Sequence, residues 1–291
     1  MHAAKMLRER LDRDRLLPVA GVYDALTARI AHHCGFEAVY MTGYGTAASY
    51  GFPDYGLLTM TEVLENLRRI SDSVLVPVIA DADTGYGNQI NVYRTVREFE
   101  RAGAAGIQLE DQTWPKRCGH MEGKQVIDAH DMVGKIKAAV DARLNSDTRL
   151  IIRTDAIACE GFEEAIARGH LYADAGADVL FIEAPSDHDQ IARVPKLLSK
   201  HCLINMALGY PDIDMEYLER LGYRIALYPI VTVVGTLRGC VEMCQSLLSK
   251  GKMEDPSTWP LDFDGMNRLL GIEEYKAIES KFAVKPLKEG Q

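Results

Sequence analysis

Residues 74–83 read Val74-Leu75-Val76-Pro77-Val78-Ile79-Ala80-Asp81-Ala82-Asp83, an apolar run that closes on two aspartates. A continuous run of this kind suits a strand of a parallel sheet that is buried on both faces. Seven further short apolar runs lie along the chain, at residues 17–20, 38–41, 104–109, 150–152, 179–182, 202–204 and 223–227. The chain therefore carries eight candidate strands of one kind.

Helix-like stretches separate these runs, and the clearest are residues 24–34, 59–71, 89–102 and 162–175. The first begins at a good N-cap residue, Asp24, and the second opens with the capping box Thr59-x-x-Glu62. The third and fourth run into Gly103 and Gly176, which suit the end of a helix. Strands that alternate with helices indicate right-handed crossovers and a parallel sheet. Eight such units favour a (β/α)8 barrel of the TIM type over an open doubly wound sheet.

No linker interrupts the first 250 residues, so residues 1–291 are interpreted as one (β/α)8 barrel domain with an extra C-terminal part. A break at residues 251–260 ends the eightfold pattern, and residues 263–280 can form one or two more helices. These helices are extra to the barrel. We therefore expect residues 251–291 to form an extension that packs on a neighbouring subunit.

Composition narrows the function classes. The 291 residues carry a formal net charge of −9, which disfavours nucleic-acid and anionic-membrane surfaces. No apolar run approaches the roughly 18 residues of a membrane span, and the charged N-terminus lacks the apolar core of a secretory signal. Six scattered cysteines do not form a disulfide scaffold, so we expect a reducing, cytoplasmic setting.

Polar residues follow the predicted strands where each strand ends. They are Thr42, Gly43 and Tyr44, then Asp81 and Asp83, Glu110 and Asp111, Arg153 to Asp155, Glu183, and Asn205. In a barrel these strand ends converge on one rim, where active sites of this fold are built. Each acid alone could simply cap the next helix. Together they would be costly to bury without a ligand, and oxygen ligands such as Asp81, Asp83 and Glu110 suit Mg²⁺ or Mn²⁺ better than zinc.

The segment 42–48 (Thr-Gly-Tyr-Gly-Thr-Ala-Ala) fits the dinucleotide fingerprint G-x-G-x-x-A. It follows the second strand rather than the first, so dinucleotide binding is disfavoured. The segment through Asp54 is interpreted as an extended loop. Its backbone N–H groups could instead hold a substrate carboxylate.

A long loop follows the fourth strand and places Lys116, Arg117, Cys118 and His120 within five residues. Loops of this length are uncommon in compact domains unless they are lids or binding loops. A cysteine among cations is not typical of a buried structural residue, and its thiolate would be stabilised there. Cys118 could act as a nucleophile or as a general acid, and these residues alone leave both roles open.

The chain resembles the isocitrate lyase/phosphoenolpyruvate mutase superfamily, specifically its lyase branch. The resemblance covers nearly the whole chain and is carried by residues 116–120 (Lys-Arg-Cys-Gly-His), 80–87, 109–112, 153–156 and 182–185. Within that branch, residues 42–49 and 52–62 are most similar to the dimethylmalate and methylisocitrate lyases. The mutase and phosphonopyruvate-hydrolase members have a different loop sequence without this cysteine.

The resemblance implies a barrel whose C-terminal helix is swapped between subunits of a homotetramer, and a requirement for Mg²⁺. It implies retro-aldol cleavage of a small 2-hydroxy dicarboxylate. The implied metal site is Asp81 and Asp83, with Glu110 and Asp54 positioning the metal's waters. The implied catalytic group is Cys118 as the acid, Lys116, Arg153, and Tyr40 as acceptor of the hydroxyl proton. The implied substrate contacts are Thr42, Gly43, Tyr44, Gly119, His120, Arg153, Glu183, Asn205 and Arg238.

Two other functions compete with this one. The first is decarboxylation or hydrolysis of oxaloacetate, which would use the same enolate chemistry. The second is a non-catalytic ligand-binding barrel, which the presence of both the acids and Cys118 disfavours.

Overall fold

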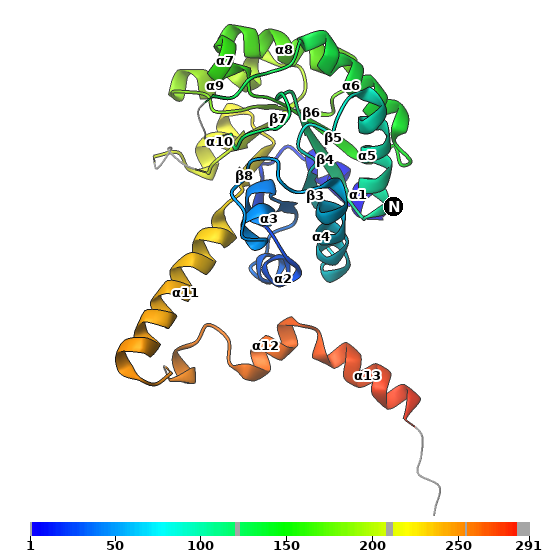
Figure 1. The fold of residues 1–291 in the computed structure, drawn as a ribbon. Helices are drawn as coiled ribbons and strands as arrows, with labels where there is room; N and C mark the ends of the chain where they lie inside the picture. Colours follow the sequence, from blue (N-terminus) through cyan, green and yellow to red (C-terminus); the bar gives the residue numbers. More distant parts are fainter. Residues whose placement is uncertain (1, 120–122, 208–211, 254, 284–291) are drawn as a thin grey trace, which may run out of the picture. The chain divides into compact units, whose positions relative to one another are not determined.

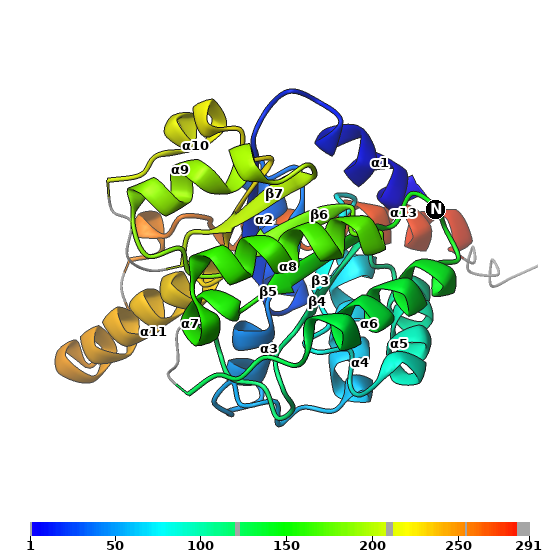
Figure 2. The same cartoon turned by 90° about the horizontal axis from the view of Figure 1, so that it is seen from above.

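A computed structural model describes residues 2–119, 123–207, 212–253 and 255–283 of the chain. Eight parallel strands form a closed barrel in sequence order (Figures 1 and 2). They are β1 (Leu17–Val22), β2 (Val39–Met41), β3 (Val78–Asp81), β4 (Gly106–Glu110), β5 (Arg149–Thr154), β6 (Val179–Ile182), β7 (His201–Asn205) and β8 (Ile225–Tyr228). Each coincides with one of the predicted apolar runs, which confirms the (β/α)8 prediction.

A helix follows every strand, and the helices from α2 to α10 surround the barrel (Figure 2). They are α2 (Ala25–His33), α3 (Gly43–Ser49), α4 (Met60–Ser73), α5 (Gln89–Arg101), α6 (Ala129–Ala142), α7 (Ala156–Glu160), α8 (Phe162–Ala175), α9 (His188–Leu197), α10 (Met215–Leu221) and α11 (Val231–Lys250). The capping box at Thr59 and Glu62 is present, and Gly176 ends α8 in the left-handed conformation. Among the described residues, no helix has the length and apolar character to span a membrane.

Helix α3 differs from the prediction, because residues 43–49 form a short helix where an extended loop was expected. The Thr42 hydroxyl accepts a hydrogen bond from the backbone of Gly45 and caps the first turn. Gly45 lies against Thr42, Tyr23 and Val233 too closely to carry a side chain. The two glycines of this segment have a low helix propensity, which favours a loop. Tertiary packing outweighs that propensity in the folded protein.

The barrel interior is filled by one or two apolar side chains from every strand except β4. Tyr40, Ile79, Ile151, Phe181 and Leu203 belong to this inner cluster, and all are buried. Helix α1 (His2–Leu11) adds Ala4, Leu7 and Leu11 to the same cluster. Because the Leu7 side chain reaches Gly106 at the start of β4, α1 covers the N-terminal end of the barrel. The carboxyl ends of the strands face the opposite end.

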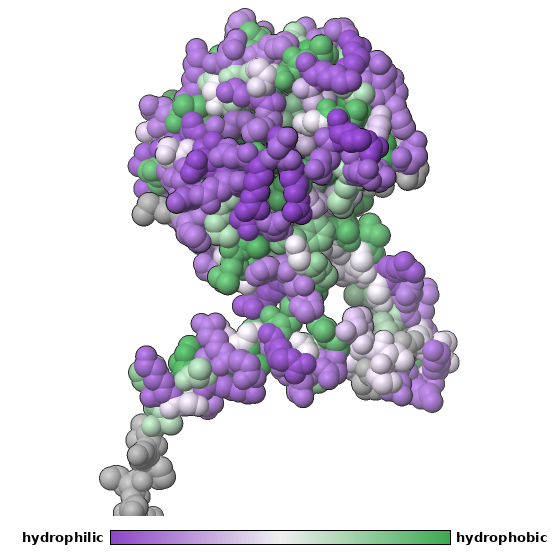
Figure 3. Space-filling view, turned by 180° about the vertical axis from the view of Figure 1, so that it is seen from behind, coloured by the Kyte–Doolittle hydropathy of each residue, from purple (hydrophilic) through white to green (hydrophobic). Residues whose placement is uncertain are grey.

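A second compact unit begins at Leu237, so it starts before the break predicted at Gly251. It contains the rest of α11, a 3₁₀ turn (Pro256–Thr258), α12 (Phe263–Leu269) and α13 (Ile272–Phe282), which confirms the two extra helices. Helix α13 buries no residue within the chain. Several large apolar side chains of this unit are exposed, including Leu248, Phe263, Tyr275 and Phe282, and the unit's surface carries hydrophobic patches (Figure 3).

We expect Phe99→Ala to lower the free energy of unfolding by about 3–5 kcal/mol, because Phe99 is fully buried between α5 and the barrel. The measurement is urea unfolding at one protein concentration, since association alters apparent stability. Ile90→Ala on the same helix is the control, because Ile90 is 79% exposed and its loss should cost less than about 0.5 kcal/mol. Equal losses in the two variants would contradict the packing described for α5.

Candidate functional site

The site residues lie two positions beyond the side chains that fill the barrel. Tyr40, Ile79, Ile151, Phe181 and Leu203 point inward, and successive residues of a strand alternate between its two faces. The residues two positions further along the chain are Thr42, Asp81, Arg153, Glu183 and Asn205. Each lies within its strand or directly follows the last residue of that strand. The same spacing links Gln108 to Glu110 on β4. The barrel therefore brings these predicted residues together at its carboxyl-terminal mouth.

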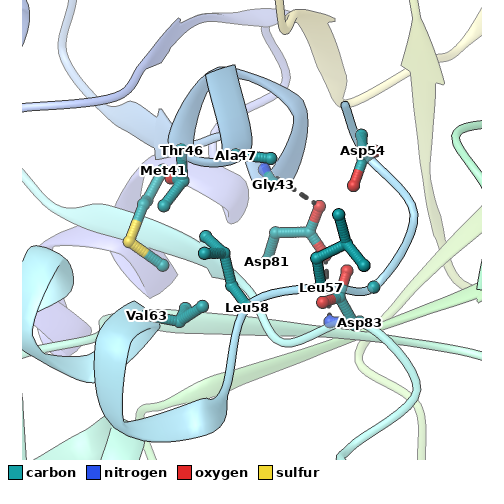
Figure 4. Close-up of a pocket in the computed structure, with 11 residues that line it drawn as sticks. Met41, Gly43, Thr46, Ala47, Asp54, Leu57, Leu58, Val63, Asp81 and Asp83 are labelled. Atoms are coloured by element: carbon teal, nitrogen blue, oxygen red, sulfur yellow. Dashed lines mark hydrogen bonds between the residues drawn. The ribbon is translucent and has the colours of Figure 1, made fainter. Parts of the chain in front are cut away.

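Asp81 ends β3 and is held by three donors. Its carboxylate accepts hydrogen bonds from the Gln108 side chain at 3.1 Å, from the Asp83 backbone at 3.1 Å and from the Gly43 backbone at 3.3 Å. The last bond joins it to the first turn of α3 (Figure 4). Gln108 is itself held, because the Tyr40 hydroxyl donates to its Oε1 at 2.6 Å. The Asp81 carboxylate therefore has a fixed orientation.

Asp83 lies in the loop after β3 with a positive φ of 48°, and Tyr86 in the same loop has φ 60°. Non-glycine residues rarely adopt this left-handed conformation, which costs about 1–3 kcal/mol and is concentrated at functional sites. The Asp83 side chain is directed towards Asp81 and Asp54 (Figure 4). Burial raises the pKa of Asp83 to about 6, although the Lys116 ammonium opposes that shift.

The Lys116 ammonium lies between two of these acids. Its Nζ is 2.6 Å from Asp54 Oδ1 and 2.8 Å from Asp83 Oδ1, and the side chain is buried. Burial alone would lower the pKa of Lys116, but Asp83 and Asp54 outweigh it and raise that pKa well above its usual value. The long loop thus places a permanent positive charge in the predicted metal site.

Glu110 ends β4 and is almost completely buried. Its Oε2 is 3.5 Å from Arg153 Nε, whereas its Oε1 is buried and has no hydrogen-bond partner in the part of the chain that the structure describes. Burial raises the pKa of Glu110 well above its usual value, against the attraction of Arg153. A buried oxygen of this kind needs a water or a cation as partner, because leaving it unpaired is costly.

The acids at the mouth of the barrel can serve a metal ion only as a small set of ligands. Within the described ranges, no three His, Cys, Asp or Glu side chains converge closely enough to form a complete ligand set. Mg²⁺ nevertheless uses only one or two carboxylates and fills its other positions with water and substrate oxygens. Asp81, Asp83 and the Glu110 oxygen that has no hydrogen-bond partner among the described residues fit such a hard cation with few protein ligands.

Arg153 forms the second charged group of the site. Its guanidinium donates to both oxygens of Asp155 at 2.8 Å and lies 3.9 Å from Glu183. It also stacks over the Phe181 ring at 5.2 Å. Burial would lower the pKa of Arg153, but Asp155 and Glu183 raise it well above its usual value. Asn205 completes the group by donating to both oxygens of Glu183, at 3.2 and 3.4 Å.

Asp111 belongs to the packing behind the site rather than to its mouth, because it lies one residue past Glu110 and faces the other side of the strand. Its carboxylate accepts hydrogen bonds from Thr154 at 2.7 Å, Tyr172 at 2.8 Å and the Asp155 backbone at 3.0 Å. Arg168 pairs with it at 3.3 Å. The expectation that Asp111 and Thr154 join a ligand site at the rim is therefore corrected, because their polar groups are already used.

The residue next to Cys118 in the chain, Gly119, lies close to Arg153 and Glu183. Cys118 is half-buried. A Cβ atom at Gly119 would clash with the Glu183 carboxylate and the Arg153 guanidinium, so this position has room only for glycine. His120 lies outside the described residues. The structure therefore places the neighbour of Cys118 directly against the residues predicted to hold substrate.

A small cavity lies beside the acids (Figure 4). Asp54, Asp81 and Asp83 line one part of it, and the remainder is mostly apolar, with Met41, Ala47, Leu57, Leu58 and Val63. Its volume of about 20 Å³ is room for one water-sized group. Gly43 also lines the cavity, whereas the neighbouring Tyr44 side chain is 39% exposed.

Two predicted site residues have other surroundings. The Tyr40 hydroxyl is buried and donates to Gln108, and burial and Asp81 raise the pKa of Tyr40 well above its usual value. A phenol in this state is a poor acceptor for a proton. Arg238 lies on α11 in the second unit, where its exposed side chain pairs with Glu242 at 3.2 Å. The structure thus does not give Tyr40 the setting that its predicted role needs, whereas the role of Arg238 stays a prediction.

The structure adds three polar residues that the sequence did not single out. Gln108 orients Asp81, Gln112 bonds to the backbone of Arg117, and Lys124 bonds to Gly119 and Asp155. Gln108 left a signal, because it is a polar residue inside an apolar strand. Gln112 and Lys124 gave no such signal in the sequence, because polar residues are common in loops.

Comparison with known proteins supports the assignment. The family model for phosphoenolpyruvate phosphomutase matches residues 7–246. The 2,3-dimethylmalate lyase of Eubacterium barkeri is 43% identical over 290 residues, which cover 97% of this chain and 99% of that protein. A 2-methylisocitrate lyase of Aeropyrum pernix is 42% identical over 252 residues, which cover 86% of this chain and 81% of that protein.

Among solved structures, a 2,3-dimethylmalate lyase described as a member of the PEP mutase/isocitrate lyase superfamily has a TM-score of 0.90 and 37% identity. The match covers 99% of this chain and 98% of that one. The resemblance proposed from the loop and strand-end motifs is therefore confirmed along the whole barrel. The chain belongs to the phosphoenolpyruvate phosphomutase family, within the phosphoenolpyruvate mutase/isocitrate lyase superfamily, and it is a carbon–carbon lyase.

Proposed function

We propose that the protein cleaves a small 2-hydroxy dicarboxylate, 2,3-dimethylmalate or 2-methylisocitrate in type, to pyruvate and a carboxylic acid with the help of Mg²⁺ or Mn²⁺. The observation that carries this proposal is the packing of Gly119 against Arg153 and Glu183. The residue that follows Cys118 in the chain therefore lies against Arg153, the cation that can hold the substrate's carboxylate. The lyases that resemble the chain over most of its length support the same reaction.

Asp81 and Asp83 would hold the metal, with Glu110 and Asp54 bonding to its waters. When bound, the ion would polarise the substrate's oxygens and lower the cost of forming the alkoxide. The Glu110 oxygen that has no hydrogen-bond partner within the described ranges supports this assignment. Lys116 would then balance the remaining negative charge of the acids.

The protein's own groups account for binding and for the final proton transfer. Arg153 and the backbone N–H groups near Thr42, Gly43 and Tyr44 would hold the carboxylate of the half that becomes pyruvate. As the C2–C3 bond breaks, the hydroxyl proton passes to water at the site and C2 becomes a carbonyl carbon. The bonding electrons stay on C3 of the other half, which becomes an enediolate of its carboxylate. The Cys118 thiol would donate its proton to C3 and become a thiolate, and Glu183 and Asn205 would complete the polar wall around the substrate.

We propose that the second unit mediates assembly. Helices α12 and α13 leave large apolar side chains exposed, which a second copy of the chain could cover in a homotetramer with exchanged C-terminal helices. The Cys118 thiol has to stay reduced to act as an acid, which favours a reducing compartment such as the cytoplasm.

Product analysis separates the lyase from the oxaloacetate-directed alternative. The wild-type protein is offered oxaloacetate and a panel of substituted malates and methylisocitrates with Mg²⁺. We expect pyruvate from the substituted malates or methylisocitrates. Oxaloacetate consumption without turnover of any substituted malate or methylisocitrate would favour the alternative activity instead.

We expect Cys118→Ser to lower turnover at least roughly a hundredfold, the low end for loss of a general acid. A hydroxyl is a much weaker acid than a thiol, although it fills nearly the same space. Pyruvate formation is followed in a coupled assay, and binding of Mn²⁺ and pyruvate is measured on the same samples. Cys34→Ser is the control, because Cys34 is an exposed cysteine at the end of α2. Near-normal turnover by the Cys118 variant would rule out the assigned role.

We expect Asp83→Asn to weaken Mn²⁺ binding at least roughly tenfold, measured by titration of the protein without substrate. Asparagine keeps the size of the side chain and tolerates the left-handed backbone of this position, so the change removes mainly the charge. Asp141→Asn removes an exposed carboxylate on α6 and should leave the titration unchanged. Identical titrations for all three proteins would place the metal elsewhere.

A further inference from the structure

Buried side chains hold backbone groups of the two residues that flank Cys118 in the chain. On the N-terminal side, the Gln112 amide accepts a hydrogen bond from the Arg117 backbone N–H at 3.0 Å and donates to the Arg117 carbonyl at 2.9 Å. Gln112 is almost completely buried, so water does not compete well for these bonds. One side chain therefore fixes both backbone groups of the residue that precedes Cys118.

On the C-terminal side, the Lys124 ammonium donates to the Gly119 carbonyl at 2.6 Å. It also lies 2.9 Å from Asp155 Oδ1, and its side chain is only 3% exposed. The Lys124 backbone is held in turn, because the Cys159 thiol of α7 donates to its carbonyl at 3.3 Å. The residue that follows Cys118 is therefore fixed as well.

Asp155 joins this arrangement to the substrate side of the site. Its carboxylate accepts from Lys124 and, through both oxygens, from Arg153. Burial would raise the pKa of Asp155, but Arg153 and Lys124 lower it, so it remains a carboxylate. The Asp155 backbone is anchored to Asp111 at 3.0 Å. One rigid carboxylate thus sets the positions of two cations, one beside Cys118 and one that can hold substrate.

We infer that Gln112 and Lys124 are positioning residues that hold the Cys118 thiol at a fixed distance from the Arg153 group. The inference rests on the proposed role of Cys118 as an acid. Neither side chain is placed against the reacting atoms, so each acts through the backbone it holds. We call the hydrogen bonds of Gln112 and Lys124 to the backbone around Cys118 the bracket. A displacement of about 1 Å in a catalytic group can lower the rate about a hundredfold, so the bracket is important for turnover.

The test uses the Lys124→Met variant, which keeps a long side chain at this position but removes its ammonium group. We expect kcat to fall roughly ten- to a hundredfold with a much smaller change in KM, because Arg153 and Asp155 remain. In the protein without substrate, we expect iodoacetamide to alkylate Cys118 several-fold faster, as resolved by peptide mass spectrometry. Gln112→Glu, which loses the donor to the Arg117 carbonyl, should shift both readouts in the same direction.

Three matched controls accompany these variants. Lys137→Met removes an exposed lysine of α6 and should match the wild type in both readouts. Lys124→Arg keeps the charge and should recover part of the lost kcat. Alkylation of exposed Cys34 and buried Cys202 is followed in every sample, because only a general opening of the fold would expose Cys202.

The inference is overturned if folded Lys124→Met keeps both its kcat and its Cys118 alkylation rate. It is also overturned if Cys202 becomes reactive together with Cys118, since Lys124 would then serve general stability. If the wild type cleaves no 2-hydroxy dicarboxylate, the proposed function fails on its own. Faster alkylation of Cys118 alone would still confirm the bracket in that case.

Discussion

Buried negative charge at the mouth of the barrel is the constraint on which the rest of the site depends. Six carboxyl groups of the described residues gather there, namely Asp54, Asp81, Asp83, Asp155, Glu110 and Glu183. Lys116, Lys124 and Arg153 form ion pairs with all of these acids except Asp81. Two of these cations come from the loop after β4. The loop therefore cannot leave the mouth without removing charge compensation from the acids. This coupling brings Cys118 to the site together with its neighbours.

The two charged groups of the site are built differently. Around Arg153 each acid has a cation or an amide at a defined distance, and Asp155 stays ionised. Around Asp81 and Asp83 the compensation is incomplete, because burial raises the pKa values of Asp83 and Glu110 even though Lys116 and Arg153 oppose the two shifts. The first group is thus suited to hold a substrate anion in place. The second is suited to accept a further cation.

The barrel and most of the site could be predicted because both depend on local patterns. Apolar runs mark the strands, and polar residues two positions beyond the inward-facing side chains mark the mouth. Asp111 was grouped with the mouth because the sequence shows where a strand ends but not which face its last residues take. Helix α3 was missed because packing around Gly45 decides its conformation. Lys124 was missed because its partners are far away in the sequence or belong to the backbone.

The seam of the barrel has a consequence for biosynthesis. Strand β1 pairs with β8, so that Leu17 lies beside Ile225, and Gly21 approaches Pro229 too closely for any side chain. The first strand therefore has no partner on that side until about two hundred further residues have left the ribosome. At roughly 5–20 residues per second, this delay is on the order of ten to forty seconds. During that time the N-terminal strand has an exposed edge, and chaperones that protect nascent chains have something to bind.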